Sequence, residues 1–344
     1  MRLRIVLVGF GNVGREFARM LLERKSELAK VHDLRADVVA ILTGRHGSVE
    51  RAGGIELRRA LRLADAGVSL ENCGRAVHGS SVDYLHRVRA DVVIEISPLR
   101  IAPRQIAVDH IVAALSSGKH VITANKGPVV YHYQRLRRLA REHGVGFRYE
   151  GTVMDGAPVF NLFQEALRGL RIESFEGILN STSNHILSKI EAGGSYEEGV
   201  ASAREMGLVE TDPSMDLDGW DAAVKACLLV NVLMGGRLRP EKVRREGISS
   251  LTSARIAAAR AAGHRIKLIA RGWREGRTLL ASVSLESVPS DHPLFSVDGT
   301  SSSLVVRTDM LKEFQIIERN PGLRQTAYAI YSDLLAIREG RLIP

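Results

Sequence analysis

The chain has 344 residues, enough for about two domains, and 45% of them are hydrophobic and 25% charged. That composition is typical of globular proteins and excludes a disordered chain. The formal net charge is +9, from 48 Lys+Arg against 39 Asp+Glu, which favours an anionic partner such as nucleic acid, a membrane surface or a phosphorylated ligand. Two cysteines, Cys73 and Cys227, exclude a disulfide-rich scaffold. Without a leader peptide or a long apolar span, we expect a cytoplasmic protein.

Short β-branched runs alternate with amphipathic helical stretches over residues 1–150. This order predicts a doubly wound parallel sheet with crossover helices. The expected strands are 4–8, 37–42, 92–96, 120–123 and 146–149. The expected helices are 13–28, 103–117 and 129–143. This half holds 25 Lys+Arg against 15 Asp+Glu, so the positive excess of the chain lies here.

A glycine-rich sequence, GFGNVG at 9–14, follows the first expected strand and opens the first expected helix. In this G-x-G-x-x-G spacing the first glycine permits a tight turn, the second lets the backbone approach a pyrophosphate, and the third lets helix and strand pack closely. We therefore expect a Rossmann-like dinucleotide-binding domain over 1–150. The expected contacts of this motif with the cofactor come from Gly9, Gly11, Asn12, Val13 and Gly14. The alternative is a glycine-rich turn that binds nothing.

The end of the second expected strand bears on which dinucleotide would bind. NAD sites usually place an acidic residue there, on the ribose 2′-hydroxyl, but the residues after Leu42 are Thr43, Gly44 and Arg45. Arg45, helped by Arg58 or Arg59, would instead pair with the 2′-phosphate of NADP. The alternative is that these arginines are ordinary solvated surface charge. The sequence thus favours NADP, and NAD stays open.

The pattern changes from residue 151, where helices are interleaved with alternating stretches. This predicts an α+β domain with an antiparallel sheet, which we expect to bind substrate and to dimerise, over 151–317. The expected helices are 157–167, 184–191, 196–206 and 219–233, and the expected strands 265–273 and 278–288 form a hairpin around Gly276. We expect the C-terminal segment 318–344, with a helix over 323–337, to pack back on the first domain.

The densest set of polar residues runs from 203 to 225. We expect Asp218 to be the N-cap of the helix over 219–233, and Asp221 and Lys225 to lie at i and i+4, so that these three charges share one face. Apolar residues follow Lys225, which predicts a partly buried ammonium suited to proton donation. The alternative is a surface salt bridge.

The run over 203–225 resembles the signature of homoserine dehydrogenases. The matching positions are Ala203, Gly207, Glu210, Asp212, Pro213, Asp216, Gly219, Asp221 and Lys225. Three further segments resemble this family in the same order: the glycine motif, TANK at 123–126 and GILNSTSN at 177–184. The resemblance spans most of the chain and is to the short form, which has no C-terminal regulatory domain. The chain departs from the family at Ser181 and in the loop 320–327, which is usually richer in glycine.

The resemblance implies the NAD(P)-dependent interconversion of L-homoserine and L-aspartate 4-semialdehyde by hydride transfer, in threonine and methionine biosynthesis. It implies a homodimer with a small-molecule substrate and with neither a nucleic-acid nor a membrane partner. The catalytic residues would be Lys225 and Lys126. The substrate would be bound by Glu210, Asp216, Asp221 and Thr182. Further cofactor contacts would come from Ser97, Asn125, Lys126 and Gly322.

The resemblance also implies a monovalent cation, such as Na⁺, held by backbone carbonyls in a turn. Its ligands would be Glu150, Val153, Asp155 and Ala157. The alternative is a plain glycine-containing turn.

Two other functions compete with this interpretation. The first is a cysteine-dependent aldehyde dehydrogenase that acts through a thiolate, with Cys227 as its nearest candidate. The second is a non-catalytic dinucleotide-binding sensor or regulator, which the basic charge would suit.

Overall fold

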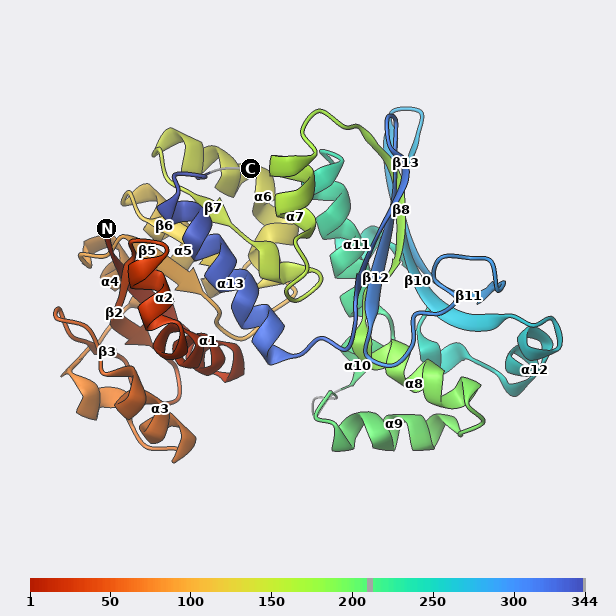
Figure 1. Cartoon of the computed structure of the whole chain (residues 1–344), viewed down its shortest axis with the longest axis horizontal. Helices are drawn as coiled ribbons and strands as arrows, with labels where there is room; N and C mark the ends of the chain where they lie inside the picture. The colour runs from red at the N-terminus through yellow and green to blue at the C-terminus, as the bar shows by residue number, and fades with distance from the viewer. Residues whose placement is uncertain (209–212, 343–344) are drawn as a thin grey trace. The chain divides into compact units, whose positions relative to one another are not determined.

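The computed structural model describes residues 1–208 and 213–342. It divides into two compact units: unit 1 comprises Met1–Asn161 and Gly322–Pro344, and unit 2 comprises Leu162–Pro321. Each unit has a sheet of its own (Figure 1).

The sheet of unit 1 has seven strands in the order β4-β3-β2-β1-β5-β6-β7. Their bounds are β1 (Arg2–Val8), β2 (Arg35–Leu42), β3 (Val49–Glu50), β4 (Arg75–Ala76), β5 (Val92–Glu95), β6 (His120–Thr123) and β7 (Phe147–Arg148). Strands β2, β1, β5, β6 and β7 run parallel, whereas β3 and β4 pair antiparallel at one edge. The strand order reverses between β1 and β5, and open α/β sheets bind ligands at such a switch point. The predicted doubly wound fold is confirmed.

Helices cover the sheet of unit 1. They are α1 (Asn12–Glu23), α2 (Lys25–Lys30), α3 (Leu57–Asp65), α4 (Ser81–Arg87), α5 (Ile106–Ser116), α6 (Lys126–Glu142), the short α7 (Val159–Asn161) and the C-terminal α13 (Leu323–Arg338). One buried cluster joins α1, α3 and α13 to alternate residues of β1 and β5, such as Ile5, Leu7 and Ile94. Helix α13 lies beside α1 in this unit (Figure 1). The second layer is formed by α4, α5 and α6, which contact one another in sequence order.

Two expected helices differ from the structure. The helix expected over 13–28 is broken at Arg24, whose φ of −94° and ψ of 13° separate α1 from α2. The helix expected over 157–167 was also wrong as a regular α-helix. The short α7 is followed there by a π-helical segment, η3 (Leu162–Ala166).

The sheet of unit 2 has six strands in the order β13-β12-β8-β10-β11-β9. Their bounds are β8 (Ile172–Ile178), β9 (Arg244–Arg245), β10 (Arg265–Glu275), β11 (Thr278–Val288), β12 (Ser302–Thr308) and β13 (Lys312–Glu318). The pairing is antiparallel except between β11 and β9, so the sheet is mixed. Strands β10 and β11 form the predicted hairpin around Gly276. The sequence patterns did not predict β8, β12 and β13.

Five α-helices accompany this sheet in the described part of unit 2. They are α8 (Ser181–Glu191), α9 (Tyr196–Glu205), α10 (Ser214–Leu217), α11 (Trp220–Leu233) and α12 (Ser253–Ala261). Helices α8, α11 and α12 contact β10, and α9 lies beside α8 (Figure 1).

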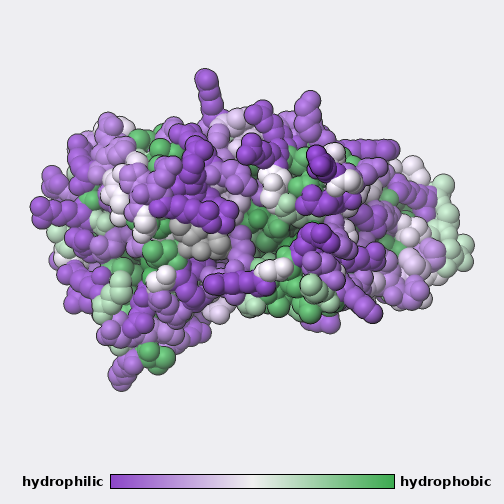
Figure 2. Space-filling view, turned by 90° about the horizontal axis from the view of Figure 1, so that it is seen from above, coloured by the Kyte–Doolittle hydropathy of each residue, from purple (hydrophilic) through white to green (hydrophobic). Residues whose placement is uncertain are grey.

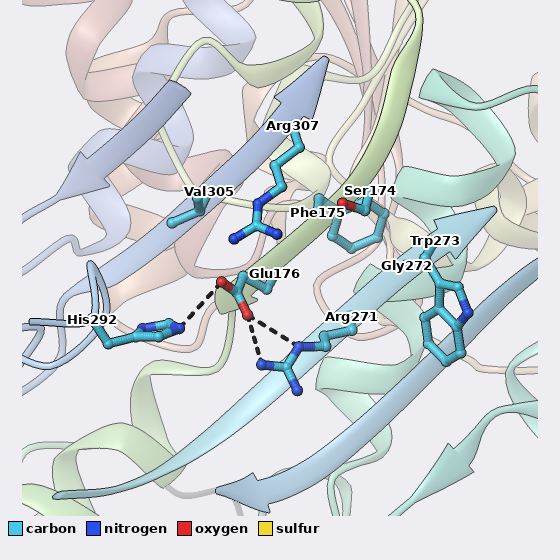
Figure 3. A pocket seen from close by; sticks show the side chains of 9 residues that line it. All are labelled: Ser174, Phe175, Glu176, Arg271, Gly272, Trp273, His292, Val305 and Arg307. Atoms are coloured by element: carbon cyan, nitrogen blue, oxygen red, sulfur yellow. Dashed lines mark hydrogen bonds and ion pairs between the residues drawn. The ribbon is translucent and has the colours of Figure 1, made fainter. Parts of the chain in front are cut away.

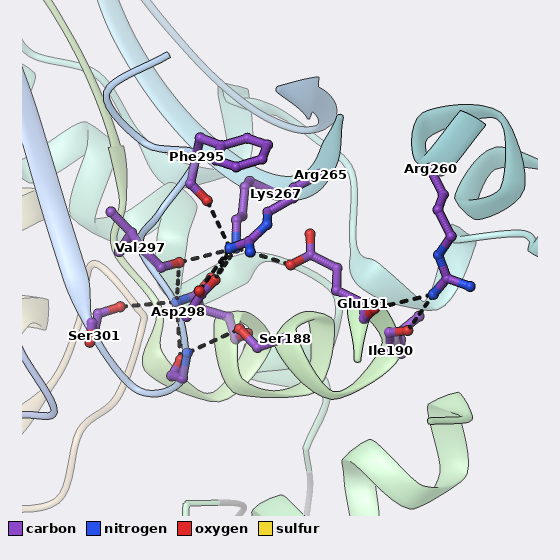
Figure 4. Close-up of polar contacts among 12 residues, drawn as sticks. Ser188, Ile190, Glu191, Arg260, Arg265, Lys267, Phe295, Val297, Asp298 and Ser301 are labelled. Carbon is purple, nitrogen blue, oxygen red and sulfur yellow. Dashed lines mark hydrogen bonds and ion pairs between the residues drawn. The ribbon is translucent and has the colours of Figure 1, made fainter. Parts of the chain in front are cut away.

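A buried polar network holds α8 and the segment after β11 against the sheet (Figure 4). Lys267 of β10 is fully buried and donates to Asp298 (3.0 Å) and to the carbonyl of Val297 (3.1 Å). Asn184 of α8 donates to the same carbonyl (3.2 Å) and to two further carbonyls of this segment. These bonds fix α8, whose N-terminus contributes to the site described next.

Candidate functional site

Lys225 lies in the second turn of α11, with 14% of its side chain exposed. Its Nζ donates to the carbonyl of Leu179 (2.6 Å) and lies 3.2 Å from Oδ2 of Asp221, one turn earlier. The predicted i,i+4 pair is therefore present, and it is half-buried rather than on the surface. An ammonium has three N–H donors. Two have partners among the described residues, so one is left for a ligand.

Asn180 joins this pair to another carboxylate. As N-cap of α8, its Oδ1 accepts from the backbone N–H of Ser183 (2.8 Å). Its Nδ2 donates to Asp216 (2.7 Å) and to Asp221 (3.1 Å). We call Asn180, Asp216, Asp221 and Lys225 the Lys225 cluster. Two carboxylates beside one ammonium give the cluster a negative balance, which suits a ligand that carries a positive charge.

The expectation for Asp218 was wrong. Asp218 ends α10, is exposed and accepts a long hydrogen bond from Ser249 (3.4 Å), so it does not join the cluster. Gly219 is the N-cap of α11, in the left-handed region with φ of +74°. A Cβ at that position would lie 2.8 Å from the carbonyl oxygen of Glu246, so glycine is required for both reasons.

Thr182 and Glu210 are the other two residues that we expected to bind substrate. Thr182 is buried in the first turn of α8, and its hydroxyl donates to the carbonyl of Leu208 (3.2 Å). Thr182 thus holds the chain just before residues 209–212. Glu210 lies outside the described residues.

In unit 1 the glycine motif has the geometry that its spacing predicts. Gly9 has φ of +110°, and a Cβ there would lie 2.4 Å from the carbonyl oxygen of Ile96. A Cβ on Gly14 would lie 2.9 Å from the carbonyl oxygen of Gly9, which shows how closely α1 packs on the turn. A Cβ on Gly11 would meet no atom within 4 Å, so there is open space at this position.

The N-terminus of α1 suits an anion. Gly11 is its N-cap without a side-chain cap, and its first turn carries no acidic residue. The first backbone N–H groups of a helix and its macrodipole favour negative charge. Asn12 is exposed and accepts from Arg15 (2.8 Å), and Val13 is partly exposed. Together with the open space at Gly11, these residues fit the pyrophosphate of a dinucleotide.

The expected 2′-phosphate residues lie on two elements. Arg45 is in the loop after β2, and Arg58 and Arg59 are in the first turn of α3. All three are exposed and form no ion pair with a carboxylate of the described chain. Gly9 donates to the carbonyl of Leu42 (2.9 Å), so the loop that carries Arg45 begins beside the glycine turn.

Ser97 and Asn125 follow neighbouring strands, β5 and β6. The Nδ2 of Asn125 donates to the carbonyl of Ser97 (3.4 Å), and its Oδ1 caps α6 by accepting from Gly127 (3.2 Å). Lys126 is the first residue of α6 and is partly exposed. Gly322 is the exposed N-cap of α13, on a different element. The structure therefore brings Ser97 and Asn125 together at the carboxyl edge of the sheet.

The turn expected to hold a cation contains a buried carboxyl group. The carboxylate of Glu150 accepts from the backbone N–H groups of Phe160 (2.8 Å) and Asn161 (2.7 Å). Burial, together with the negative charge of Asp333, raises the pKa of Glu150 to about 8. Asp155 has φ of +34° and its side chain accepts from a hydroxyl of α13 (2.7 Å). Among the described residues no group of three His, Cys, Asp or Glu side chains could hold a metal ion, so only carbonyl ligation would place one here.

Neither cysteine is suited to nucleophilic catalysis. Cys227 is fully buried in α11, and burial raises the pKa of its thiol to about 12. Cys73 is also buried, and burial raises the pKa of its thiol. A reactive cysteine needs an accessible thiolate, so the geometry does not favour cysteine chemistry.

A hollow of about 340 Å³ lies on the sheet of unit 2 (Figure 3). Glu176 of β8 lies at its centre, 2.7 Å from Arg271 and 3.3 Å from His292. None of the residues singled out from the sequence lines this hollow.

Two family models match the chain. The model described as homoserine dehydrogenase, NAD binding domain, matches residues 9–150, and the model described as homoserine dehydrogenase matches residues 158–335. The homoserine dehydrogenase of Methanocaldococcus jannaschii is 38% identical over 337 residues, which are 97% of this chain and 98% of that protein. The NAD(+)-dependent homoserine dehydrogenase of Pseudomonas canavaninivorans is 33% identical and is covered to 96%, with 98% of this chain.

Solved structures give the same result. A putative homoserine dehydrogenase from Archaeoglobus fulgidus superimposes with a TM-score of 0.86 at 34% identity, covering 98% of this chain and 99% of that one. A hyperthermophilic archaeal homoserine dehydrogenase in complex with NADPH superimposes with a TM-score of 0.82 at 27% identity, covering 98% of both chains.

Proposed function

Because this chain belongs to the homoserine dehydrogenase family, we propose that it interconverts L-homoserine and L-aspartate 4-semialdehyde by hydride transfer with a nicotinamide dinucleotide. The observation that carries the proposal is the Lys225 cluster, in which the signature residues of unit 2 converge on one ammonium. The glycine turn of unit 1 supplies the matching anion site for the dinucleotide.

In this proposal Lys225 is the acid and base for the substrate oxygen. The bound nicotinamide supplies or accepts the hydride. When an aldehyde is reduced, negative charge develops on its oxygen, and a nearby ammonium stabilises that charge and donates the proton. The carbonyl of Leu179 accepts one N–H group of Lys225, and the ion pair with Asp221 holds the ammonium on its other side, which leaves an N–H group for the substrate. In the reverse direction the neutral amine would remove the proton from the hydroxyl group of homoserine.

The remaining substrate contacts are proposed from the same cluster. Asp216 and Asp221 would lie on the ammonium side of homoserine, where their charge is complementary, and Glu210 would join them. Thr182, whose hydroxyl donates to the carbonyl of Leu208, would contact the substrate. Lys126, at the N-terminus of α6 in unit 1, would act on the substrate oxygen or carboxylate as a second cation.

We further propose a preference for NADP. The loop after β2 carries no carboxylate that would repel a 2′-phosphate, and Arg45, Arg58 and Arg59 offer exposed guanidinium groups. The fold accepts either dinucleotide at its pyrophosphate site, so the choice depends on these arginines.

A monovalent cation is proposed in the turn that begins at Glu150. The buried carboxyl groups of Glu150 and Asp333 lie close enough to interact, and the carbonyls of Glu150, Val153, Asp155 and Ala157 would provide the ligands. Its role would be to hold the turn, because no reacting group of the proposed mechanism lies on it.

A homodimer is also proposed, through the sheet face of Figure 3. This face carries Arg271 and Arg307 as well as Glu176 and Glu286, and in a two-fold interface such a mixed patch meets its own copy with opposite charges opposed. Light scattering coupled to size-exclusion chromatography should give twice the chain mass, and Arg307→Glu should shift it toward one chain. A wild-type mass of one chain would count against the dimer.

A cytoplasmic location is proposed from the same family membership. Within the part of the chain that the structure describes, no helix is long and apolar enough to cross a membrane. Hydrophilic residues cover most of the face seen in Figure 2.

A direct assay tests the proposed function. The purified protein is mixed with L-homoserine and either NAD or NADP, and the absorbance of the reduced nicotinamide is followed. Turnover with homoserine, and none with threonine or serine, is the expected result. A folded sample that produces no reduced nicotinamide with either cofactor would refute the proposal.

A further inference from the structure

A buried carboxylate lies at the end of β5 and has no part in the mechanism above. Glu95 is fully buried, and its Oε1 accepts hydrogen bonds from the hydroxyl and from the backbone N–H (3.3 Å) of Ser97. His110 of α5 is 5% exposed, with its Nδ1 3.7 Å from the same oxygen and its Nε2 2.7 Å from the hydroxyl of Ser81. We call Ser81, Glu95, Ser97 and His110 the Glu95 cluster.

The strand itself does not need this carboxylate. The preceding residues of β5 are Val92, Val93 and Ile94, all fully buried, so an apolar side chain would suit the position by packing alone. The Oε2 atom of Glu95 is buried and has no hydrogen-bond partner among the described residues. Burying a charge with incomplete hydrogen bonding is unfavourable. Such an arrangement is expected where position matters more than stability.

The cluster lies at the switch point of the sheet. Val8 of β1 pairs with Glu95 of β5, and these are the two strands between which the order reverses. The loops that follow them touch, because the Cβ position of Gly9 is 2.4 Å from the oxygen of Ile96 and 2.9 Å from the nitrogen of Ser97. The wall of the dinucleotide site on the β5 side is therefore the backbone that Glu95 holds.

The same backbone is also tied to the next strand. Thr123 of β6 donates to the carbonyl of Glu95 (2.8 Å), and the N–H of Asn125 donates to the hydroxyl of Thr123 (3.0 Å). The side chain of Asn125 in turn donates to the carbonyl of Ser97 (3.4 Å). The loop after β5 thus packs against Gly9 and is hydrogen-bonded to Asn125 and to the carboxylate of Glu95.

We propose that Glu95 is a positioning residue for the dinucleotide: its carboxylate, held beside His110, fixes Ser97 against the glycine turn and so sets the wall of the cofactor site. The proposal rests on dinucleotide binding by unit 1 and not on the identity of the substrate. Glu95 itself touches no reacting atom, and its effect is exerted through Ser97.

The test compares two neutralising substitutions at opposite ends of β5. Glu95→Gln keeps the size of the side chain and one acceptor oxygen, but replaces the carboxylate by an amide, whose hydrogen bonds from Ser97 are weaker. Asp91→Asn is the matched control: Asp91 precedes β5, accepts from the N–H of Arg4 (2.7 Å) and is paired with its guanidinium (2.8 Å), at the other edge of the sheet. Binding is measured with the full chain by titrating the reduced cofactor and following its fluorescence, and thermal unfolding is recorded alongside.

We expect Glu95→Gln to weaken cofactor binding about tenfold and to raise the KM for the cofactor by a similar factor, while kcat and the KM for homoserine change less than threefold. Asp91→Asn should lower the melting temperature and leave the dissociation constant within twofold of wild type. Ser97→Ala removes the hydroxyl bond and keeps the backbone one, so it should weaken binding in the same direction, and the effects of Ser97→Ala and Glu95→Gln should be less than additive.

Three results would overturn the proposal. The first is a Glu95→Gln protein that folds and binds the cofactor as wild type does. The second is equal weakening by Glu95→Gln and Asp91→Asn, which would reduce the effect to stability. The third applies if Glu95→Gln does not fold: His110→Gln and Ser97→Ala must then weaken binding, and normal binding by both refutes the idea. Wild-type binding without homoserine turnover would refute the proposed function alone.

Discussion

Replacing Gly9 by alanine tests the glycine turn, and the structure provides a matched control. Gly9 has φ of +110° and Gly54, in the loop before α3, has φ of +100°, so alanine is strained to a similar degree at both positions. That strain costs about 1–3 kcal/mol of folding free energy in each case. The two positions differ in their surroundings. The new Cβ would lie 2.4 Å from the oxygen of Ile96 at position 9, but 3.7 Å from its nearest neighbour, Asp37, at position 54.

Only the first substitution must move the cofactor site. To lengthen the 2.4 Å contact to 3.0 Å, below which Cβ contacts are essentially never found, the loop 96–97 and the glycine turn must separate by about 0.6 Å. A displacement approaching 1 Å in a binding site costs on the order of tenfold to a hundredfold in function. We therefore expect Gly9→Ala to raise the dissociation constant of the reduced cofactor by about that factor. Gly54→Ala should lose only the stability that the strained backbone costs, and keep its affinity.

Cofactor titration and urea unfolding of the two variants measure both quantities. Equal cofactor affinity in the two proteins would show that close contact between the loops after β1 and β5 does not shape the site. A Gly9→Ala protein as stable as wild type would refute the strain argument separately.

Three further predictions concern the ionisable residues. Lys225→Met should lower kcat about 10²–10⁴-fold, the usual contribution of a general acid, and leave the cofactor affinity of unit 1 within twofold of wild type. Steady-state rates and a cofactor titration measure these two quantities. A near-normal kcat would show that Lys225 is not the proton donor. Arg45→Ala should raise the KM for NADP about tenfold or more, as expected for a charged hydrogen bond, with little change for NAD; equal changes for both cofactors would mean that Arg45 does not meet the 2′-phosphate. Glu150 should make folding less favourable as pH rises, because its carboxyl group titrates near pH 8 when folded and near 4.5 when unfolded. Relative to the Glu150→Gln protein, the wild-type free energy of unfolding should fall by about 2–5 kcal/mol between pH 4.5 and 8 and then level off. Urea titrations of both proteins measure this, and a difference between them that does not change with pH would contradict the raised pKa.

The parts of the fold that the sequence predicted correctly are those with local signals. The turn after β1 needs a glycine at position 9, where φ is positive, and another at position 14, which packs against Gly9. The residue types alone therefore predict the geometry of this turn. The hairpin of β10 and β11 likewise shows alternation on both sides of Gly276. Strands β3 and β4 have two residues each, too few for any periodic pattern.

Strand β8 shows why other elements were missed. Its sequence, IESFEGI, contains two glutamates, and one of them, Glu176, pairs with Arg271 across the sheet rather than facing water alone. A charged residue that is paired within the fold gives the same sequence pattern as one in a loop. Only the contact with Arg271 in the folded protein distinguishes Glu176 from a glutamate in a loop.

The candidate site divides in the same way. The contact of Asp221 with Lys225 follows from helical spacing and could be predicted. Asp218 was placed wrongly because α11 begins one residue later, through the left-handed Gly219. Asn180 bonds to Asp216 and Asp221, which lie 36 and 41 positions further along the chain. No local pattern contains that information.

The path of the chain has a consequence for how the protein is made. Unit 2 is a continuous insertion within unit 1, whose core is completed only by α13. On the ribosome, the whole of Leu162–Pro321 is synthesised before Ala327, Ile330 and Leu334, which belong to the same buried cluster as Phe17. Part of the apolar surface of unit 1 therefore stays uncovered until the last segment has been synthesised. A fragment that ends before α13 should bind an apolar dye and aggregate, although it retains every residue of the glycine turn.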